Sequence, residues 1–201
     1  MLSEQLTDQQ GRFYGPVDYV MYNIKTNKLS VWQYYQVLIL LLLGFAPSIS
    51  MAINDQVRLA NLPGTSTQQL RELADESDWQ VRQAVAMNRK TPSDVLEKLA
   101  RDPVQDVRIA VCTNLSTTEP VFFILAKDPS EQVRSVVARF EYVSAAVLAS
   151  MSNDSSTDIR IEVARNWNTD IPTLEKLSKD EFEEVRNMAL HSINDRKKQE
   201  Q

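Results

Sequence analysis

The sequence predicts an all-α solenoid of about five two-helix repeats of 26 residues, preceded by an apolar helical cap at the N-terminus. The main observation is an aliphatic residue followed by arginine that recurs every 26 residues. The pairs are Val81-Arg82, Val107-Arg108, Val133-Arg134, Ile159-Arg160 and Val185-Arg186. Only 4 glycines are present, which suits helices with short connections better than a turn-rich β fold. An uncharged apolar run at 37–53 could cover the first repeat.

Aligned on the arginine, each repeat keeps the same pattern of apolar and acidic residues. The units span about 66–91, 92–117, 118–143, 144–169 and 170–195. An acid stands six residues before every arginine, as Glu76, Asp102, Asp128, Asp154 and Asp180. Neither helix of a unit can bury its apolar stripe alone, so stacking of neighbouring units must supply the core.

The second unit shows where the helices are expected. The first helix is predicted over Pro92–Ala100, with Thr91 as its N-cap. Asp102 can cap the amide groups of a second helix over Pro103–Thr113. Asn114 is expected to end that helix in a left-handed conformation.

These residues resemble a known family of helical repeats. The phrase T-P-x-x-V-L-E-K-L-A-x-D-P-x-x-D-V-R-x-A-V-x-x-N, from Thr91 to Asn114, resembles the leucine-rich repeat variant and is similar to the broader HEAT-like repeats. The resemblance covers about 66–195 and implies a right-handed solenoid in which one helix of each pair is short and 3₁₀ in character. Residues 55–61 resemble a worn sixth copy. One member of that family carries an iron–sulfur cluster on N-terminal cysteines, but this chain has no such cysteines, so the resemblance implies no cofactor.

Three interpretations of the uncharged stretch before the repeats remain open. Trp32 to Ile53 has the length of a transmembrane helix. A secretory signal is a poor fit because some 36 residues precede the apolar run. A soluble helix over 31–43 would have Ser30 as N-cap and Gly44 at its end. These helix-capping residues favour the soluble helix. They therefore also favour a cytoplasmic location over a membrane anchor at about 32–53.

The predicted domain organisation follows from these patterns. Residues 1–62 form an N-terminal helical cap or membrane-anchor region, 63–195 form the helical repeat domain, and 196–201 form a polar tail. The net charge of −5 arises in residues 63–201, which hold 23 acidic and 18 basic residues. This acidity disfavours nucleic acid as a partner.

The residue inventory argues against enzymatic chemistry. Cys112 is the single cysteine and His191 the single histidine, so neither a disulfide within the chain nor a cysteine- or histidine-based metal site is expected. No phosphate-binding glycine loop and no nucleophile elbow occur. We therefore expect no cofactor, no metal and no catalytic residues.

The recurring arginines and acids form a predicted ladder, which has two interpretations. Its members are Arg82, Arg108, Arg134, Arg160, Arg186, Asp102, Asp128, Asp154 and Asp180. A row of guanidinium groups could bind phosphates or an acidic partner. Alternatively, each arginine bonds the acid six residues earlier, or its equivalent in the next unit. The matching number of acids favours this structural role.

A more variable column follows the ladder by five residues and is the candidate partner-binding surface. It holds Met87, Thr113, Arg139, Arg165 and His191. These residues should face outward near the end of each second helix, and the last three could form a basic patch. A solvated helix face is the alternative. The predicted function is a non-enzymatic scaffold that binds another protein along its superhelical groove. A nucleic-acid-binding module and a membrane-tethered adaptor are the alternatives.

Overall fold

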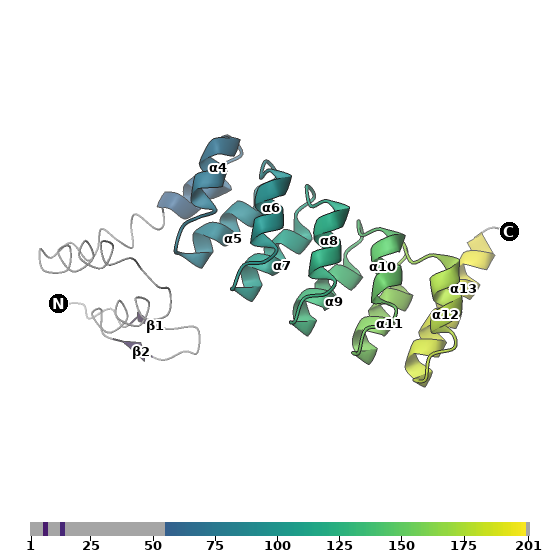
Figure 1. The fold of residues 1–201 in the computed structure, drawn as a ribbon. Coiled ribbons are helices and arrows are strands. Elements are labelled where there is room, and N and C mark those ends of the chain that lie inside the picture. Colours follow the sequence, from purple (N-terminus) through teal and green to yellow (C-terminus); the bar gives the residue numbers. More distant parts are fainter. Residues whose placement is uncertain (1–5, 8–12, 15–54, 200–201) are drawn as a thin grey trace, which may run out of the picture. The chain divides into compact units, whose positions relative to one another are not determined.

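The computed structural model describes residues 6–7, 13–14 and 55–199 (Figure 1). The chain divides into two compact units, Met1–Arg58 and Leu59–Gln201. In the first unit, β1 (Leu6–Thr7) pairs antiparallel with β2 (Phe13–Tyr14), a pairing that the sequence did not suggest. Apart from these two short strands, the described residues form helices and the turns that join them.

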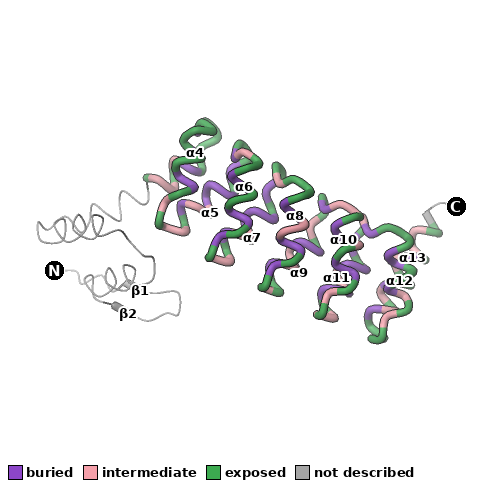
Figure 2. Tube along the Cα trace, in the orientation of Figure 1, coloured by how far each residue is buried: buried purple, intermediate pink, exposed green. Residues whose placement is uncertain are grey.

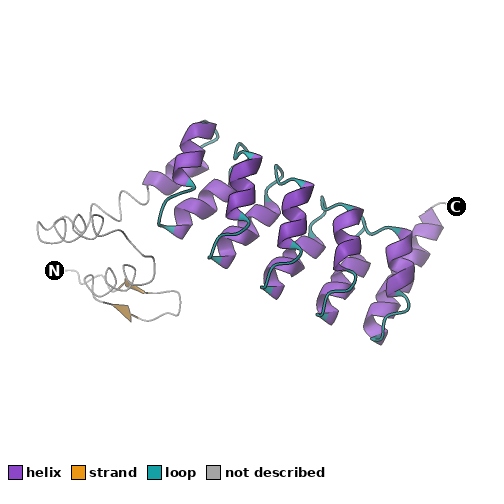
Figure 3. Cartoon of the chain, in the orientation of Figure 1, coloured by secondary structure: helices purple, strands orange, loops and turns teal. Residues whose placement is uncertain are grey.

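Ten helices in the second unit recur in pairs. The first helices are α4 (Thr67–Leu73), α6 (Ser93–Leu99), α8 (Glu119–Leu125), α10 (Ala145–Met151) and α12 (Ile171–Leu177). The second helices are α5 (Trp79–Met87), α7 (Gln105–Thr113), α9 (Glu131–Arg139), α11 (Thr157–Arg165) and α13 (Glu183–Gln199). Each helix begins 26 residues after its equivalent. Figures 1 and 3 show the first helices in one row and the second helices in a row behind them, joined by short loops. All ten are α-helices, so the implied 3₁₀ character is absent from this described part.

The helix boundaries differ slightly from the prediction. Helix α6 starts at Ser93 with Pro92 at the N-cap, because the hydroxyl of Thr91 donates instead to the carbonyl of Val85 at 2.5 Å. Helix α7 starts at Gln105, two residues later than expected. The carboxylate of Asp102 accepts a hydrogen bond from the Val104 amide at 2.8 Å, which holds Asp102 and Pro103 in the connecting turn rather than in the helix.

The core lies between the two rows. In the repeat at 92–117, Leu96, Leu99, Val107 and Val111 are 0–1% exposed. Figure 2 shows that buried stretches recur in every helix pair. Full burial of one such side chain stabilises the fold by about 1.5–3 kcal/mol. Small residues let successive second helices approach closely, namely Ala86, Cys112, Ala138 and Ala164, each 0% exposed.

The N-terminal predictions fall mostly outside the described residues. The stretch 32–53, considered above as a membrane helix or a soluble cap, is among the residues that the structure does not describe. Residues 55–61, the worn sixth copy, are helical. Within the described ranges, no helix has both the length and the apolar character needed to cross a bilayer.

Candidate functional site

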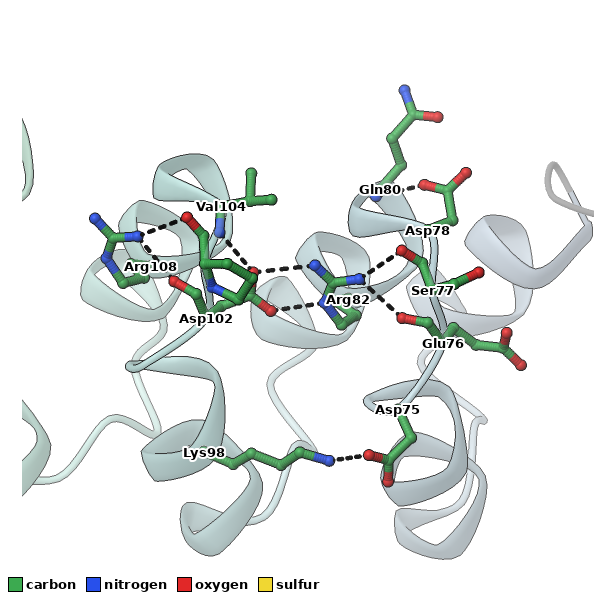
Figure 4. A network of polar contacts seen from close by, with 11 residues as sticks. Asp75, Glu76, Ser77, Asp78, Gln80, Arg82, Lys98, Asp102, Val104 and Arg108 are labelled. Atoms are coloured by element: carbon green, nitrogen blue, oxygen red, sulfur yellow. Dashed lines mark hydrogen bonds and ion pairs between the residues drawn. The ribbon is translucent and has the colours of Figure 1, made fainter. Parts of the chain in front are cut away.

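The ladder arginines join each repeat to the next one. Arg108 donates from Nε and Nη2 to the two carboxylate oxygens of Asp128, at 2.7 and 3.0 Å. Its Nη1 donates to the backbone carbonyl of Asp102 at 2.8 Å. Figure 4 shows the same arrangement at Arg82, whose guanidinium donates to both carboxylate oxygens of Asp102. The remaining equivalent pairs are Arg134 with Asp154 and Arg160 with Asp180. The bidentate carboxylate partner therefore belongs to the next unit, whereas the acid six residues earlier accepts a hydrogen bond at its backbone carbonyl.

These ion pairs are largely shielded from water. The side chain of Arg108 is 12% exposed and that of Asp128 is 3% exposed. The hydrogen bond from Arg160 lowers the pKa of Asp180 below its ordinary value, against the opposing effect of burial. Because each guanidinium already binds a carboxylate and a carbonyl, these four arginines have little capacity left for an external anion.

The fifth arginine differs from the other four. Arg186 donates from Nη1 to the carbonyls of Asp180 and Glu181, both at 2.8 Å. Among the residues that the structure describes, no carboxylate pairs with it. Arg186 thus keeps the contacts within its own unit but lacks a cross-repeat carboxylate among the described residues, which makes it a natural reference for the other ladder arginines.

A second set of cross-repeat bonds comes from asparagines, and their role was not predicted. The side-chain amide of Asn114 donates to the carbonyls of Ala86 and Asn88 at 2.6 and 2.9 Å, and its oxygen accepts from the Ser116 amide at 2.8 Å. We call this arrangement an asparagine clasp. In two further clasps, the side-chain amide of Asn88 donates to the carbonyls of Ala60 and Leu62, and that of Asn166 donates to the carbonyls of Ala138 and Phe140. The predicted left-handed conformation of Asn114 is wrong. Its backbone is extended (φ −78°, ψ 124°), because the side chain must reach the preceding turn.

The turn that follows the helix at 55–61 and the turns that follow α5, α7, α9 and α11 form what we call the turn edge, residues 62–65, 88–91, 114–117, 140–143 and 166–169. Successive turns are directly linked: the Ser116 hydroxyl donates to the Arg89 carbonyl at 2.7 Å, and the Asn168 amide donates to the Glu141 carbonyl at 2.7 Å. Large apolar side chains are exposed in or next to every turn, namely Leu62, Met87, Leu115, Tyr142 and Trp167, at 51–63%. One exposed apolar residue is ordinary, but one per repeat at the same junction indicates a surface for another molecule.

The predicted partner-binding column lies beside this edge. All five residues, Met87, Thr113, Arg139, Arg165 and His191, are exposed. Two of them, Arg165 and His191, meet around one cleft of about 300 Å³ that is also lined by Trp167 and Arg196. Met87, Thr113 and Arg139 lie in earlier units and do not line it.

The sequence does not single out Leu115, and its aromatic pattern favours a repacked core for Tyr142 and a core or edge position for Trp167 over a partner-binding surface. These three residues stand seven or eight residues after the ladder arginine. The signal that could have found them is a large apolar residue recurring in turns, where nothing in the core requires one.

The third repeat replaces the asparagine clasp with aromatic packing. Phe140 occupies the asparagine position, and its ring lies 5.7 Å from that of Phe122 and 5.6 Å from that of Tyr142, centroid to centroid. Phe122 is buried, whereas Tyr142 is 63% exposed. The cluster therefore extends from the core to the turn edge.

The single cysteine and the single histidine differ in their surroundings. Cys112 is buried, and burial raises the pKa of its thiol to about 12. His191 is exposed and pairs through Nδ1 with Asp195 at 3.1 Å. Over the described ranges, no group of histidine, cysteine, aspartate and glutamate is arranged to hold a metal ion.

Comparison with known families bears on the repeat itself. Residues 79–104 match the leucine rich repeat variant. The matched segment has the length of one repeat and contains both members of the first ladder pair, Arg82 and Asp102. The predicted resemblance to the leucine rich repeat variant is confirmed there. A search of curated proteins found no match to the chain.

Proposed function

We propose that this protein is a non-enzymatic scaffold whose five 26-residue repeats form a right-handed solenoid that binds another protein along the turn edge. One observation carries the proposal. A large apolar residue that is more than half exposed recurs in or next to every turn of the turn edge, from Leu62 to Trp167. Helical repeats commonly bind proteins through an extended surface to which each unit contributes one or two side chains.

The two sets of cross-repeat bonds support this proposal because they make the edge rigid. The arginine ladder ties successive units through buried, bidentate ion pairs, such as Arg134 with Asp154. The asparagine clasps tie the turns themselves, as Asn114 does. A surface held in this way loses little conformational entropy on binding, so its apolar contacts contribute more fully to affinity.

The turn edge suits a partner better than the ladder does. The four paired ladder arginines and their aspartates are 3–14% exposed and bonded to one another, so a partner would have to break those bonds first. The side chains of Leu115, Tyr142 and Trp167 already face solvent, so covering them is favourable at about 25 cal/mol per Å² of apolar surface.

Quantitative affinity purification tests the proposal. The full chain and a variant carrying Leu115→Asp and Tyr142→Asp would be used as baits in lysate of the source organism. Leu190→Asp serves as the matched control, because Leu190 is similarly exposed at 47% but lies within helix α13 and not in a turn. We expect at least one protein to be retained by the wild type and by the control but lost from the double variant. Equal recovery with all three baits would refute binding along the turn edge.

A further inference from the structure

The last repeat differs from the others in a way that creates the cleft at its end. Ser192 stands where Asn88, Asn114 and Asn166 stand in other units, and helix α13 continues to Gln199 instead of turning. The Ser192 hydroxyl still donates to the carbonyl of Ala164 at 2.7 Å. The continuing helix therefore lies against the turn of the preceding unit, and the cleft of about 300 Å³ opens between them.

Arg196 fixes the aromatic wall of this cleft. Its guanidinium lies 5.3 Å from the ring centroid of Trp167 and donates to the carbonyls of Asn166, Trp167 and Thr169. The indole is nonetheless 61% exposed. A large apolar ring held in place beforehand, with one face open to water, can receive an apolar side chain at little entropic cost.

Most charged groups around the cleft have a partner of opposite charge. Arg165 pairs with Glu162 at 2.8 Å, and the Asp195 carboxylate, which also lines the cleft, pairs with Lys198 Nζ at 3.5 Å and contacts His191 Nδ1 at 3.1 Å. Arg196 contacts neutral groups, namely three carbonyls and the Trp167 ring, and within the described part of the chain no carboxylate forms an ion pair with it. Burial lowers its pKa, and Asp170 offsets this only through space. An anion placed beside Arg196 would complete its electrostatic surroundings.

We propose that this cleft binds an acidic segment of a partner protein, with an apolar side chain against Trp167 and a carboxylate between Arg165 and Arg196. The inference rests on the proposed function and names the partner's chemistry at one end of the turn edge. A nucleic acid fits less well. Its charge would extend beyond the cleft onto residues 63–201, which carry 23 acidic and 18 basic side chains, whereas the charge of a short peptide segment stays local.

Selection from a random-peptide display library against the full chain tests this proposal. We expect the enriched peptides to combine aspartate or glutamate with an aromatic or aliphatic residue. Their affinity should fall about tenfold or more in Trp167→Ala and in Arg196→Gln, as for a central interface residue. Leu190 lies on α13, as Arg196 does, but does not line the cleft. Leu190→Ala should therefore leave the peptide affinity unchanged within about twofold. Thermal unfolding of each variant shows whether the fold is intact, and Arg165→Gln provides a second, exposed substitution if Arg196→Gln does not fold.

Several outcomes would overturn the inference. Enrichment of peptides without acidic residues, or binding that survives Trp167→Ala, excludes the proposed occupant. Peptides that lose affinity in Leu115→Ala but not in Trp167→Ala would place binding elsewhere on the turn edge, so the proposed function would stand without the cleft. Competition by a single-stranded oligonucleotide at lower concentration than by any enriched peptide would assign the cleft to nucleic acid instead.

Discussion

Arg134→Ala should destabilise the repeats much more than Arg186→Ala. Arg134 forms a bidentate pair with Asp154 at 2.7 and 3.1 Å and also donates to the carbonyl of Asp128 at 2.9 Å. Arg186 makes only the bonds to carbonyls of its own unit. The comparison therefore isolates the contact that crosses from one repeat to the next.

The magnitude follows from burial. Loss of one member of a buried ion pair costs about 3–5 kcal/mol, because an uncompensated charge remains. Arg134 is 14% exposed and Asp154 is 7% exposed, so water can partly reach the abandoned carboxylate, and we expect about 2–4 kcal/mol. Arg186→Ala should cost about 1 kcal/mol, the net value of its hydrogen bonds. At about 2–4 °C for each kcal/mol, a loss of 3 kcal/mol lowers Tm by about 6–12 °C.

Equilibrium unfolding in guanidinium chloride, followed by circular dichroism, measures both variants. The slope of the free energy of unfolding against denaturant shows whether the repeats still unfold as one cooperative unit. The double variant Arg134→Ala with Asp154→Ala should lose less than the sum of the two single losses, because it leaves no isolated carboxylate. Equal losses for Arg134→Ala and Arg186→Ala would refute the reasoning, since the cross-repeat carboxylate would then contribute nothing.

Three further predictions concern stability and reactivity. Because the folded-state pKa of Asp180 is lowered, its contribution to stability is present above about pH 4 and is lost as pH falls below that value; Asp180→Asn should flatten the loss of stability between about pH 5 and pH 3, and an unchanged pH profile would contradict this. The Cys112 thiol should react with a disulfide reagent only when the protein unfolds, so rapid labelling of the native protein at pH 8 would contradict its burial. Asn114→Ala should cost about 2–3 kcal/mol in denaturant titrations, because buried backbone groups of the preceding turn lose their donor, whereas Arg101→Ala, which removes an exposed pair with Glu97, should cost about 0.5 kcal/mol or less.

The sequence alone determined the period and the residues that recur with it. A repeat of 26 residues places Arg108 and Arg134 at one equivalent position and Asp102 and Asp128 at another, and the apolar spacing around Val107 specifies a helix that needs a neighbour on each side. This information is local and periodic, so it can be read without knowing how the chain turns. It also predicted that Arg165 and His191 are exposed, which they are. Arg165 ends α11 as expected, but the expectation that His191 lies near the end of its helix is wrong, because α13 continues to Gln199.

Only the tertiary structure decided which groups meet. From spacing alone, each arginine could bond the acid six residues earlier or its equivalent in the next unit. The turn at Asp128 directs its carboxylate to Arg108 of the preceding unit and its carbonyl to Arg134 of its own unit, and this direction depends on the backbone of the turn. The cleft likewise needs α13 to continue past Ser192, so that Arg196 reaches Trp167 from 29 residues away. Contacts of this kind arise when whole repeats stack on one another. The sequence of a single repeat does not specify them.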